Sequence, residues 1–225
     1  MDIDERGSSD NLEGNCPPPE DSCSKKIIYL LGNTGSGKTQ LIRRTHESLR
    51  GRLQIMAIYC QPNSIYDVER LKAAGIPAMI HTETIRTHLN TDQPLKGEGN
   101  LLLFYEFSGR TGYSLQKKND IFRVYVFSVT DGDEKPLKYP RMFKEIELII
   151  LNKVDLLPFT DFSITRFKTQ LRLVNPTVPI IKLSCRSGVG LDNWRNWLLK
   201  LYGERHLEES GSLPRLNNFP GISSF

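Results

Sequence analysis

GNTGSGKT, at residues 32–39, is the stretch of sequence that decides the fold. It matches the pattern G-x-x-x-x-G-K-[ST] at every fixed position. A short apolar run at 27–31 precedes it, and a helical pattern at 37–49 follows it. This context predicts a buried strand, a phosphate-binding loop, and a helix whose N-terminus points at the bound anion. The alternative is a glycine-rich turn with an incidental lysine, which the flanking strand and helix patterns disfavour.

Each fixed position of this loop has a physical role. The glycines allow backbone N–H groups to turn inward around a phosphate, and the lysine reaches the β- and γ-phosphates. The hydroxyl of the last residue, Thr39, is a magnesium ligand in loops of this kind. The predicted phosphate-binding residues are Gly32, Asn33, Thr34, Gly35, Ser36, Gly37, Lys38, Thr39 and Gln40.

Outside the loop, short apolar runs alternate with helical patterns. The runs predict strands at 27–31, 55–59, 78–80, 101–105, 124–129, 148–151 and 180–183, and the other patterns predict helices at 37–49, 65–74, 162–173 and 191–201. Strands that are apolar on both faces and alternate with helices indicate a parallel sheet covered on both sides. We therefore predict an α/β fold of the P-loop NTPase type, with a doubly wound, mainly parallel sheet flanked by helices. Ligands of such sheets bind beyond the carboxyl ends of the strands.

A carboxylate is expected near the phosphates, because a magnesium–phosphate site needs one. Glu106 directly follows the predicted strand 101–105, and Gly109 comes three residues later. Glu106 is predicted to hold magnesium directly or through water, and the Gly109 N–H to contact the γ-phosphate. Without the loop at 32–39, a solvated residue at the edge of the sheet would be the better interpretation of Glu106.

Two later loops are predicted to read the base. Asn152-Lys153-Val154-Asp155 follows the strand at 148–151 and matches N-K-x-D, in which the aspartate accepts hydrogen bonds from N1–H and the N2 amino group of guanine. Adenine lacks both donors, so such a site discriminates strongly. Ser184 and Cys185 follow the next strand, where backbone N–H groups of this kind of protein contact guanine O6. The alternative is an ordinary strand-to-helix loop, in which Asn and Asp are common.

Composition restricts the class of protein. Hydrophobic residues make up 38% and charged residues 25% of the 225, and the net charge is +4 with no dominant basic run, so no nucleic-acid partner is expected. No apolar stretch approaches the ~20 residues that cross a bilayer, and the first ten residues are polar and acidic, so we expect a cytoplasmic protein without a membrane partner. Residues 1–24 are predicted to be a disordered tail, 25–202 a P-loop G domain, and 203–225 a C-terminal tail.

The segment S-V-T-D-G-D-E-K-P-L-K-Y-P at 128–140 is very similar to a segment of one family. That family is the hydrogenase nickel-incorporation GTPases (HypB), SIMIBI-type P-loop GTPases related to the urease accessory GTPases. The resemblance spans roughly residues 26–201 and includes N-K-V-D-L-L-P at 152–158 and D-V-E-R at 67–70. It implies hydrolysis of GTP to GDP with Mg²⁺ and nickel delivery with a partner such as the maturation protein HypA. Residues 130–135 are predicted to be a polar loop at the carboxyl edge of the sheet, and the resemblance implies that this loop takes part in a nucleotide-dependent homodimer.

The departures from the family fall on functional positions. The family binds its transition metal with a Cys-His pair and a second cysteine, whereas this chain has Thr87, His88 and Tyr113 at the matching positions. His88 remains as the one candidate ligand for Ni²⁺ or Zn²⁺, and one imidazole cannot hold nickel tightly. Gln61 replaces a family carboxylate, for which Asp67 can partly substitute.

The remaining cysteines leave alternatives open. Cys60 is either a soft metal ligand or a small buried residue, and the pair Cys16 and Cys23 does not reproduce the metal motif at the N-terminus of some members.

Three functions are weighed on these grounds. The first is a GTPase that drives nickel delivery in metalloenzyme maturation, with Lys38, Glu106 and Asp67 as its catalytic residues and slow turnover. The second is a nucleotide-switch scaffold or regulatory protein that has lost metal handling, which the missing cysteines and Gln61 favour. The third, a small-molecule kinase, is disfavoured by the guanine-reading motif at 152–155.

Overall fold

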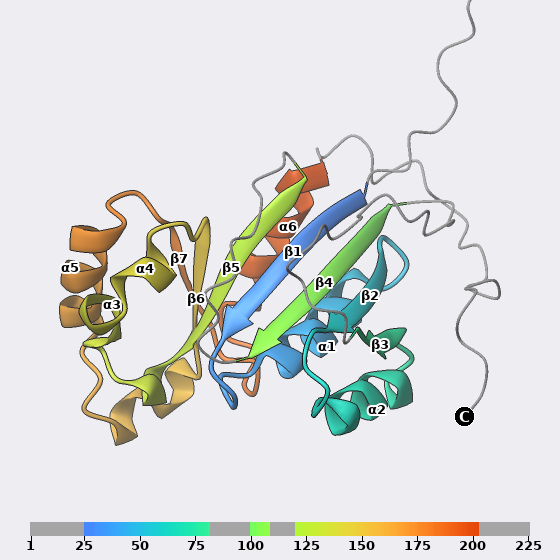
Figure 1. The fold of residues 1–225 in the computed structure, drawn as a ribbon, viewed down its shortest axis with the longest axis horizontal. Helices are drawn as coiled ribbons and strands as arrows, with labels where there is room; N and C mark the ends of the chain where they lie inside the picture. Colours follow the sequence, from blue (N-terminus) through green and yellow to red (C-terminus); the bar gives the residue numbers. More distant parts are fainter. Residues whose placement is uncertain (1–24, 82–99, 109–119, 203–225) are drawn as a thin grey trace, which may run out of the picture.

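The computed structural model describes residues 25–81, 100–108 and 120–202, which form one seven-stranded sheet with helices packed against it (Figure 1). Every strand pair is parallel, and the strand order is β3-β2-β4-β1-β5-β6-β7. The strands are β1 (Lys25–Gly32), β2 (Gln54–Tyr59), β3 (Ala78–Ile80), β4 (Leu101–Ser108), β5 (Ile121–Ser128), β6 (Leu148–Asn152) and β7 (Ile180–Lys182).

The connections place β1 at the centre of the sheet. From β1 the chain crosses to β2 and β3 on one side, then returns through β4 to β5, β6 and β7 on the other. The sheet is therefore doubly wound, and the prediction of an α/β, doubly wound parallel sheet is confirmed. The loop after β1 lies at the carboxyl edge, next to the ends of both β4 and β5.

The helices lie where the sequence pattern predicts them, with shifts of one or two residues at their ends. They are α1 (Lys38–Leu49), α2 (Ile65–Ala73), α5 (Ile164–Val174) and α6 (Leu191–Tyr202). Two short helices, α3 (Lys135–Lys138) and α4 (Pro140–Phe143), and two 3₁₀ turns, η1 (Val129–Asp131) and η2 (Val154–Phe159), were not predicted. None of the described helices has the length and apolar character needed to span a bilayer.

Two apolar clusters fix the helices on the sheet. In the first, Ile28 and Leu30 of β1 pack with helices α1 and α6. Trp194 of α6 donates its indole N–H to the hydroxyl of Thr45 in α1 at 2.8 Å. In the second, aromatic residues of β5, α4 and α5 meet, with the Phe127 and Phe167 rings 4.6 Å apart. Burial of apolar area at about 25 cal/mol per Å² stabilises both contacts, and α1 is held rigidly behind the loop it follows.

The segment after β5 differs from the polar loop predicted at 130–135. Ser128 caps η1, because its side chain accepts from Thr130 N–H while Asp131 accepts from the Ser128 N–H. This capping box orders the chain before α3 begins.

One other sequence prediction is corrected and another is left open. Strand β4 runs on to Ser108, so Glu106 lies inside the strand rather than after it. The predicted tails, 1–24 and 203–225, lie outside the described residues, and the domain division stays a prediction.

Candidate functional site

The loop between β1 and α1 depends on glycine at two close approaches. Gly32 has φ of +147° and Gly37 has φ of +100°. A Cβ on Gly32 would overlap the carbonyl oxygen of Val126 in β5, and a Cβ on Gly37 would overlap the side-chain amide of Asn152. The loop can therefore press against β5 and β6 only with glycine at both positions. Thr34 and Gly35 are exposed at its tip, and Gln40 follows in the first turn of α1.

Lys38 is buried beneath this loop, with 4% of its surface exposed. Its Nζ donates to the carbonyl oxygens of Gly32 and Asn33, both at 2.8 Å, and lies 3.1 Å from Oε1 of Glu106. Burial lowers the pKa of Lys38, while the charge and the hydrogen bond of the Glu106 carboxylate oppose that change. The structure thus brings two of the predicted catalytic residues together as a buried ion pair.

Thr39 is hydrogen-bonded to Asp67, the third predicted catalytic residue. Its hydroxyl donates to Oδ1 of Asp67 at 3.1 Å, and the Tyr59 hydroxyl donates to Thr39 Oγ1 at 3.0 Å. Asp67 lies in the first turn of α2, and Tyr59 is the last residue of β2. Burial raises the pKa of Tyr59 above its ordinary value, so its phenol stays protonated as a donor.

Asn152 ties the first loop to both loops predicted to read the base. Its Nδ2 donates to the carbonyl oxygen of Ser36 at 2.8 Å, and its Oδ1 accepts from the N–H of Cys185 at 3.1 Å and of Lys153 at 2.8 Å. Lys153 has φ of +62°, the one positive φ of a non-glycine residue in the described chain. The three predicted loops therefore meet at one buried amide.

Asp155 carries a buried oxygen whose hydrogen bonding is unmet. Within the described residues its Oδ1 is shielded from solvent and has no hydrogen-bond partner. A buried carboxylate oxygen without a donor is costly, so its retention points to a ligand that supplies N–H groups. This is the arrangement expected for guanine, whose N1–H and N2 amino group are such donors.

The loop at 184–188 is ordered by its own contacts. Ser184 Oγ accepts from the N–H of Ser187 at 3.1 Å. Arg44 of α1 donates from Nε to the carbonyl of Cys185 at 2.8 Å and from a terminal nitrogen to that of Arg186 at 3.1 Å. Burial raises the pKa of the Cys185 thiol to about 12, so this side chain serves as a small packed residue rather than a nucleophile.

Of the residues predicted near the transition-metal site, the structure describes Cys60 alone. His88, together with Thr87, Tyr113 and Gly109, lies outside the described residues. Burial and the Glu106 carboxylate raise the pKa of Cys60 to about 12, which disfavours the thiolate that binds metal. Within the part of the chain that the structure describes, no group of three His, Cys, Asp or Glu side chains could hold a metal ion.

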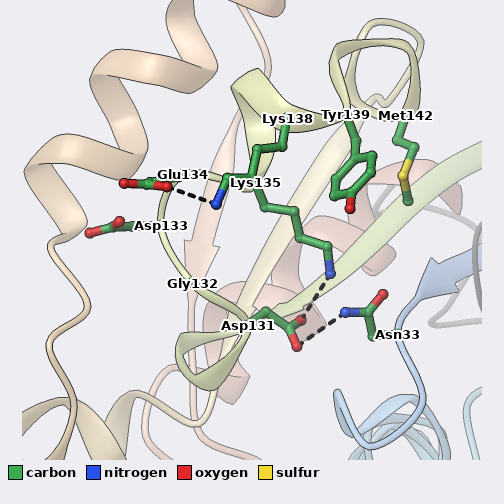
Figure 2. A pocket seen from close by; sticks show the side chains of 9 residues that line it. All are labelled: Asn33, Asp131, Gly132, Asp133, Glu134, Lys135, Lys138, Tyr139 and Met142. Carbon is green, nitrogen blue, oxygen red and sulfur yellow. Dashed lines mark hydrogen bonds and ion pairs between the residues drawn. The ribbon is translucent and has the colours of Figure 1, made fainter.

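A polar pocket of about 520 Å³ adjoins the first loop (Figure 2). Figure 2 shows Lys135 reaching toward Asp131, which also accepts from Asn33 Nδ2 at 3.2 Å. Among the residues predicted from the sequence to bind nucleotide, Asn33 alone lines this pocket. Its lining consists of Asn33, Asp131, Gly132, Asp133, Glu134, Lys135, Lys138, Tyr139 and Met142.

The described residues fit a magnesium nucleotide. The loop has the positive-φ glycines and the buried lysine that surround phosphates. Thr39 presents a hydroxyl beside the carboxylate of Asp67, and Asp155 presents an acceptor without a donor. Oxygen ligands of this kind suit Mg²⁺.

Three contributing residues were missed by the sequence reasoning. Tyr59 could have been found, because a tyrosine at the carboxyl end of a buried strand needs a partner for its hydroxyl. Asp131 lies three residues after a serine, the spacing of a capping box. Arg44 carries no local signal, since its partners are 141 and 142 residues away in the sequence.

The chain is similar to known proteins in sequence and in fold. No protein-family model matches the chain. The hydrogenase maturation factor HypB of Escherichia coli (strain K12) is 36% identical over 184 residues, covering 76% of this chain and 62% of that protein. HypB of Azotobacter vinelandii is 34% identical over 188 residues, covering 80% and 61%. The chain thus spans about three fifths of the length of these curated relatives.

Two solved structures match the fold. HypB from Archaeoglobus fulgidus has a TM-score of 0.64 at 29% identity, covering 79% of this chain and 90% of that one. HypB from Helicobacter pylori, solved in complex with nickel, has a TM-score of 0.63 at 22% identity, covering 82% and 90%. Over the part of the curated relatives that it spans, the chain is therefore a relative of the HypB family of hydrogenase maturation factors.

Proposed function

We propose that the chain binds GTP with Mg²⁺ and hydrolyses it to GDP and phosphate. The observation that carries this proposal is the buried Asp155 Oδ1, which has no donor among the described residues. It comes three residues after Asn152, whose side-chain amide donates to Ser36 in the glycine-built loop. The kinship with HypB supports it.

The contacts of the described residues support the following catalytic roles. Lys38 exchanges the carbonyls of Gly32 and Asn33 for the β- and γ-phosphates, because a phosphate is the stronger acceptor for a cation. Thr39 holds the magnesium, which neutralises charge on the phosphate oxygens when bound. Glu106 and Asp67 orient Lys38 and Thr39, respectively. Gln61 supplies no carboxylate, so catalysis depends on positioning and electrostatics, and turnover is slow.

Guanine selectivity is the direct test. Titration of GTP, GDP and ATP should give binding of the first two and none of ATP. Asp155→Asn should weaken GTP by about 3 kcal/mol, roughly 100-fold, because it removes the charged acceptor. Asp161→Asn, a charge-matched change at an exposed position, should bind GTP like the wild type. Equal binding of ATP and GTP by the wild-type chain contradicts the proposal.

We propose nickel delivery to a hydrogenase as the process that this GTPase serves. Support comes from the HypB relatives, one of which was solved in complex with nickel. The second candidate, a nucleotide switch without metal handling, is favoured by Thr87 and Tyr113 in place of ligands and by the raised pKa of Cys60.

Nickel binding distinguishes these two candidates. If the nucleotide switch without metal handling is right, equilibrium dialysis with Ni²⁺, with and without GTP, should give binding weaker than micromolar that GTP does not tighten, because one imidazole is a poor nickel site. Wild type is compared with His88→Ala and Cys60→Ala, and with His46→Ala on α1 as the control histidine. Micromolar or tighter binding that is lost in His88→Ala alone refutes the scaffold candidate.

We also propose that residues 130–135 take part in a nucleotide-dependent homodimer, as the resemblance to HypB implies. The hydrogen bond from Asn33 to Asp131 supports this, because it couples the phosphate loop to that segment. Sedimentation with a non-hydrolysable GTP analogue should give a dimer, and with GDP a monomer. The same sedimentation with both nucleotides contradicts this part of the proposal.

A further inference from the structure

Thr39 belongs to a chain of three side chains that come from three different elements. Tyr59 at the end of β2 donates to Thr39 Oγ1 at 3.0 Å, and Thr39 in α1 donates to Oδ1 of Asp67 in α2 at 3.1 Å. Figure 1 shows α1 and α2 close to β2, in the half of the sheet that ends in β3. The chain ends in the carboxylate, so each hydroxyl donates in one direction.

The two hydrogen bonds of the Thr39 hydroxyl suit it to bind a cation. A threonine hydroxyl has one hydrogen to donate and two lone pairs to accept with. Asp67 takes the hydrogen and Tyr59 fills one lone pair, which leaves one lone pair on Thr39 Oγ1. A hydroxyl that ligates a cation needs one directed lone pair and no freedom to turn it away. Both partners therefore remove the rotation that would cost the threonine its ligand geometry.

Both partners are held firmly by the fold. Tyr59 is 1% exposed and belongs to the first apolar cluster, and its carbonyl accepts from the His81 N–H at 2.9 Å. It lies in register with Glu106 on the neighbouring strand β4, at the carboxyl edge. Asp67 is fixed because the next residue, Val68, packs in the same cluster as the tyrosine ring. A buried tyrosine hydroxyl usually finds a hydrogen-bond partner, and for Tyr59 that partner is the predicted magnesium ligand.

We propose that Tyr59 is a positioning residue of the magnesium site, which acts together with Asp67 by fixing the hydroxyl of Thr39 with one lone pair toward the cation. The proposal rests on the proposed function, since it assumes a magnesium nucleotide. It adds a residue on β2 that touches neither nucleotide nor metal. The effect of Tyr59 on nucleotide binding is therefore confined to conditions in which magnesium is present.

Tyr59→Phe removes only the hydroxyl, and the chain offers a matched control. Tyr125 on β5 is also buried, at 1% exposed, and its hydroxyl has no hydrogen-bond partner within the described residues. Tyr125→Phe therefore removes a phenol oxygen from the same sheet without touching Thr39. Asp67→Asn is the second test variant, because its amide oxygen can still accept from Thr39 while the negative charge is gone.

The readout is the dissociation rate of a fluorescent GDP analogue, measured against free Mg²⁺ concentration and again in EDTA. Tyr59→Phe should need about two- to tenfold more Mg²⁺ for half-maximal slowing, the effect of one lost hydrogen bond. Asp67→Asn should also raise the Mg²⁺ concentration needed, because a neutral amide oxygen is a weaker acceptor for the Thr39 hydroxyl than a carboxylate. The rate of Tyr59→Phe in EDTA should stay within about twofold of wild type, and Tyr125→Phe should match wild type throughout.

Two results overturn the inference, and they differ from failure of the proposed function. A Tyr59→Phe profile that coincides with wild type shows that the hydroxyl has no part in magnesium binding. An equal weakening in EDTA and in Mg²⁺ shows that Tyr59 supports the loop alone. A wild-type chain whose dissociation ignores Mg²⁺ refutes the proposed magnesium nucleotide as well.

Discussion

Replacing Asn152 with alanine tests the central contact of the site. The change deletes three hydrogen bonds, to the Ser36 carbonyl at 2.8 Å, the Cys185 N–H at 3.1 Å and the Lys153 N–H at 2.8 Å. The first two are buried, while the third is partly exposed and can turn to water. Leaving a buried donor or acceptor unsatisfied costs about 1–3 kcal/mol each, so Asn152→Ala should lower the free energy of unfolding by about 2–6 kcal/mol. That is a large part of the 5–15 kcal/mol typical of a domain.

Urea unfolding of the nucleotide-free chain measures this directly. With a slope of about 2 kcal/mol per M, the midpoint of Asn152→Ala should fall by about 1–3 M. Asn33→Ala is the control, because its amide makes one partly buried hydrogen bond, to Asp131 at 3.2 Å, and should cost about 0.5–1.5 kcal/mol. If Asn152→Ala loses less than about 1 kcal/mol, or no more than Asn33→Ala, the loops are held together by other contacts and the reasoning is wrong.

Two further predictions concern charged groups. Lys38→Ala should abolish GTP binding in a titration. It should also lower the free energy of unfolding by about 3–5 kcal/mol, because it removes the cation paired with the buried Glu106. Adding Glu106→Gln should recover part of the lost free energy of unfolding. Burial alone would raise the pKa of Asp133, but hydrogen bonds from the Ser163 N–H and Arg166, both at 2.8 Å, lower it. Its contribution to stability is therefore present above the unfolded-state pKa of about 3.9 and is lost as the pH falls through the lower folded-state value. Urea midpoints taken from pH 7 to pH 2 should fall less steeply for Asp133→Asn than for wild type, and parallel curves would contradict the assignment.

The fold could be predicted because its signals are local. The sequence 32–39 specifies a strand, a glycine loop and a helix within a few residues, and every long apolar run became a strand of the sheet. The segment at 128–138 was predicted poorly, because a capping box between Ser128 and Asp131 depends on hydrogen bonds that a polar composition does not reveal. The strand order could not be predicted either, because the periodicity of apolar residues identifies strands but not which strands are neighbours.

The sequence predicts residues of the candidate site but not the contacts between them. Lys38, Thr39 and Asp155 come from motifs whose spacing carries their chemistry. The pairing of Thr39 with Tyr59 and of Arg44 with the loop at 184–188 depends on helices and strands meeting in space. Such contacts depend on tertiary packing, which a motif does not encode.

The tie that Asn152 makes to Ser36, 116 residues earlier in the sequence, has a consequence for how the protein is made. Synthesis delivers the phosphate loop first. The amide that secures it comes 116 residues after Ser36, and Trp194, which holds α1, comes 149 residues after its partner Thr45. A chain interrupted after β5 would carry the lysine and the glycines without the contacts that keep them in shape. Long-range contacts of this kind form late, so the phosphate loop reaches its final shape only after β6 and α6 have been made and have packed in place.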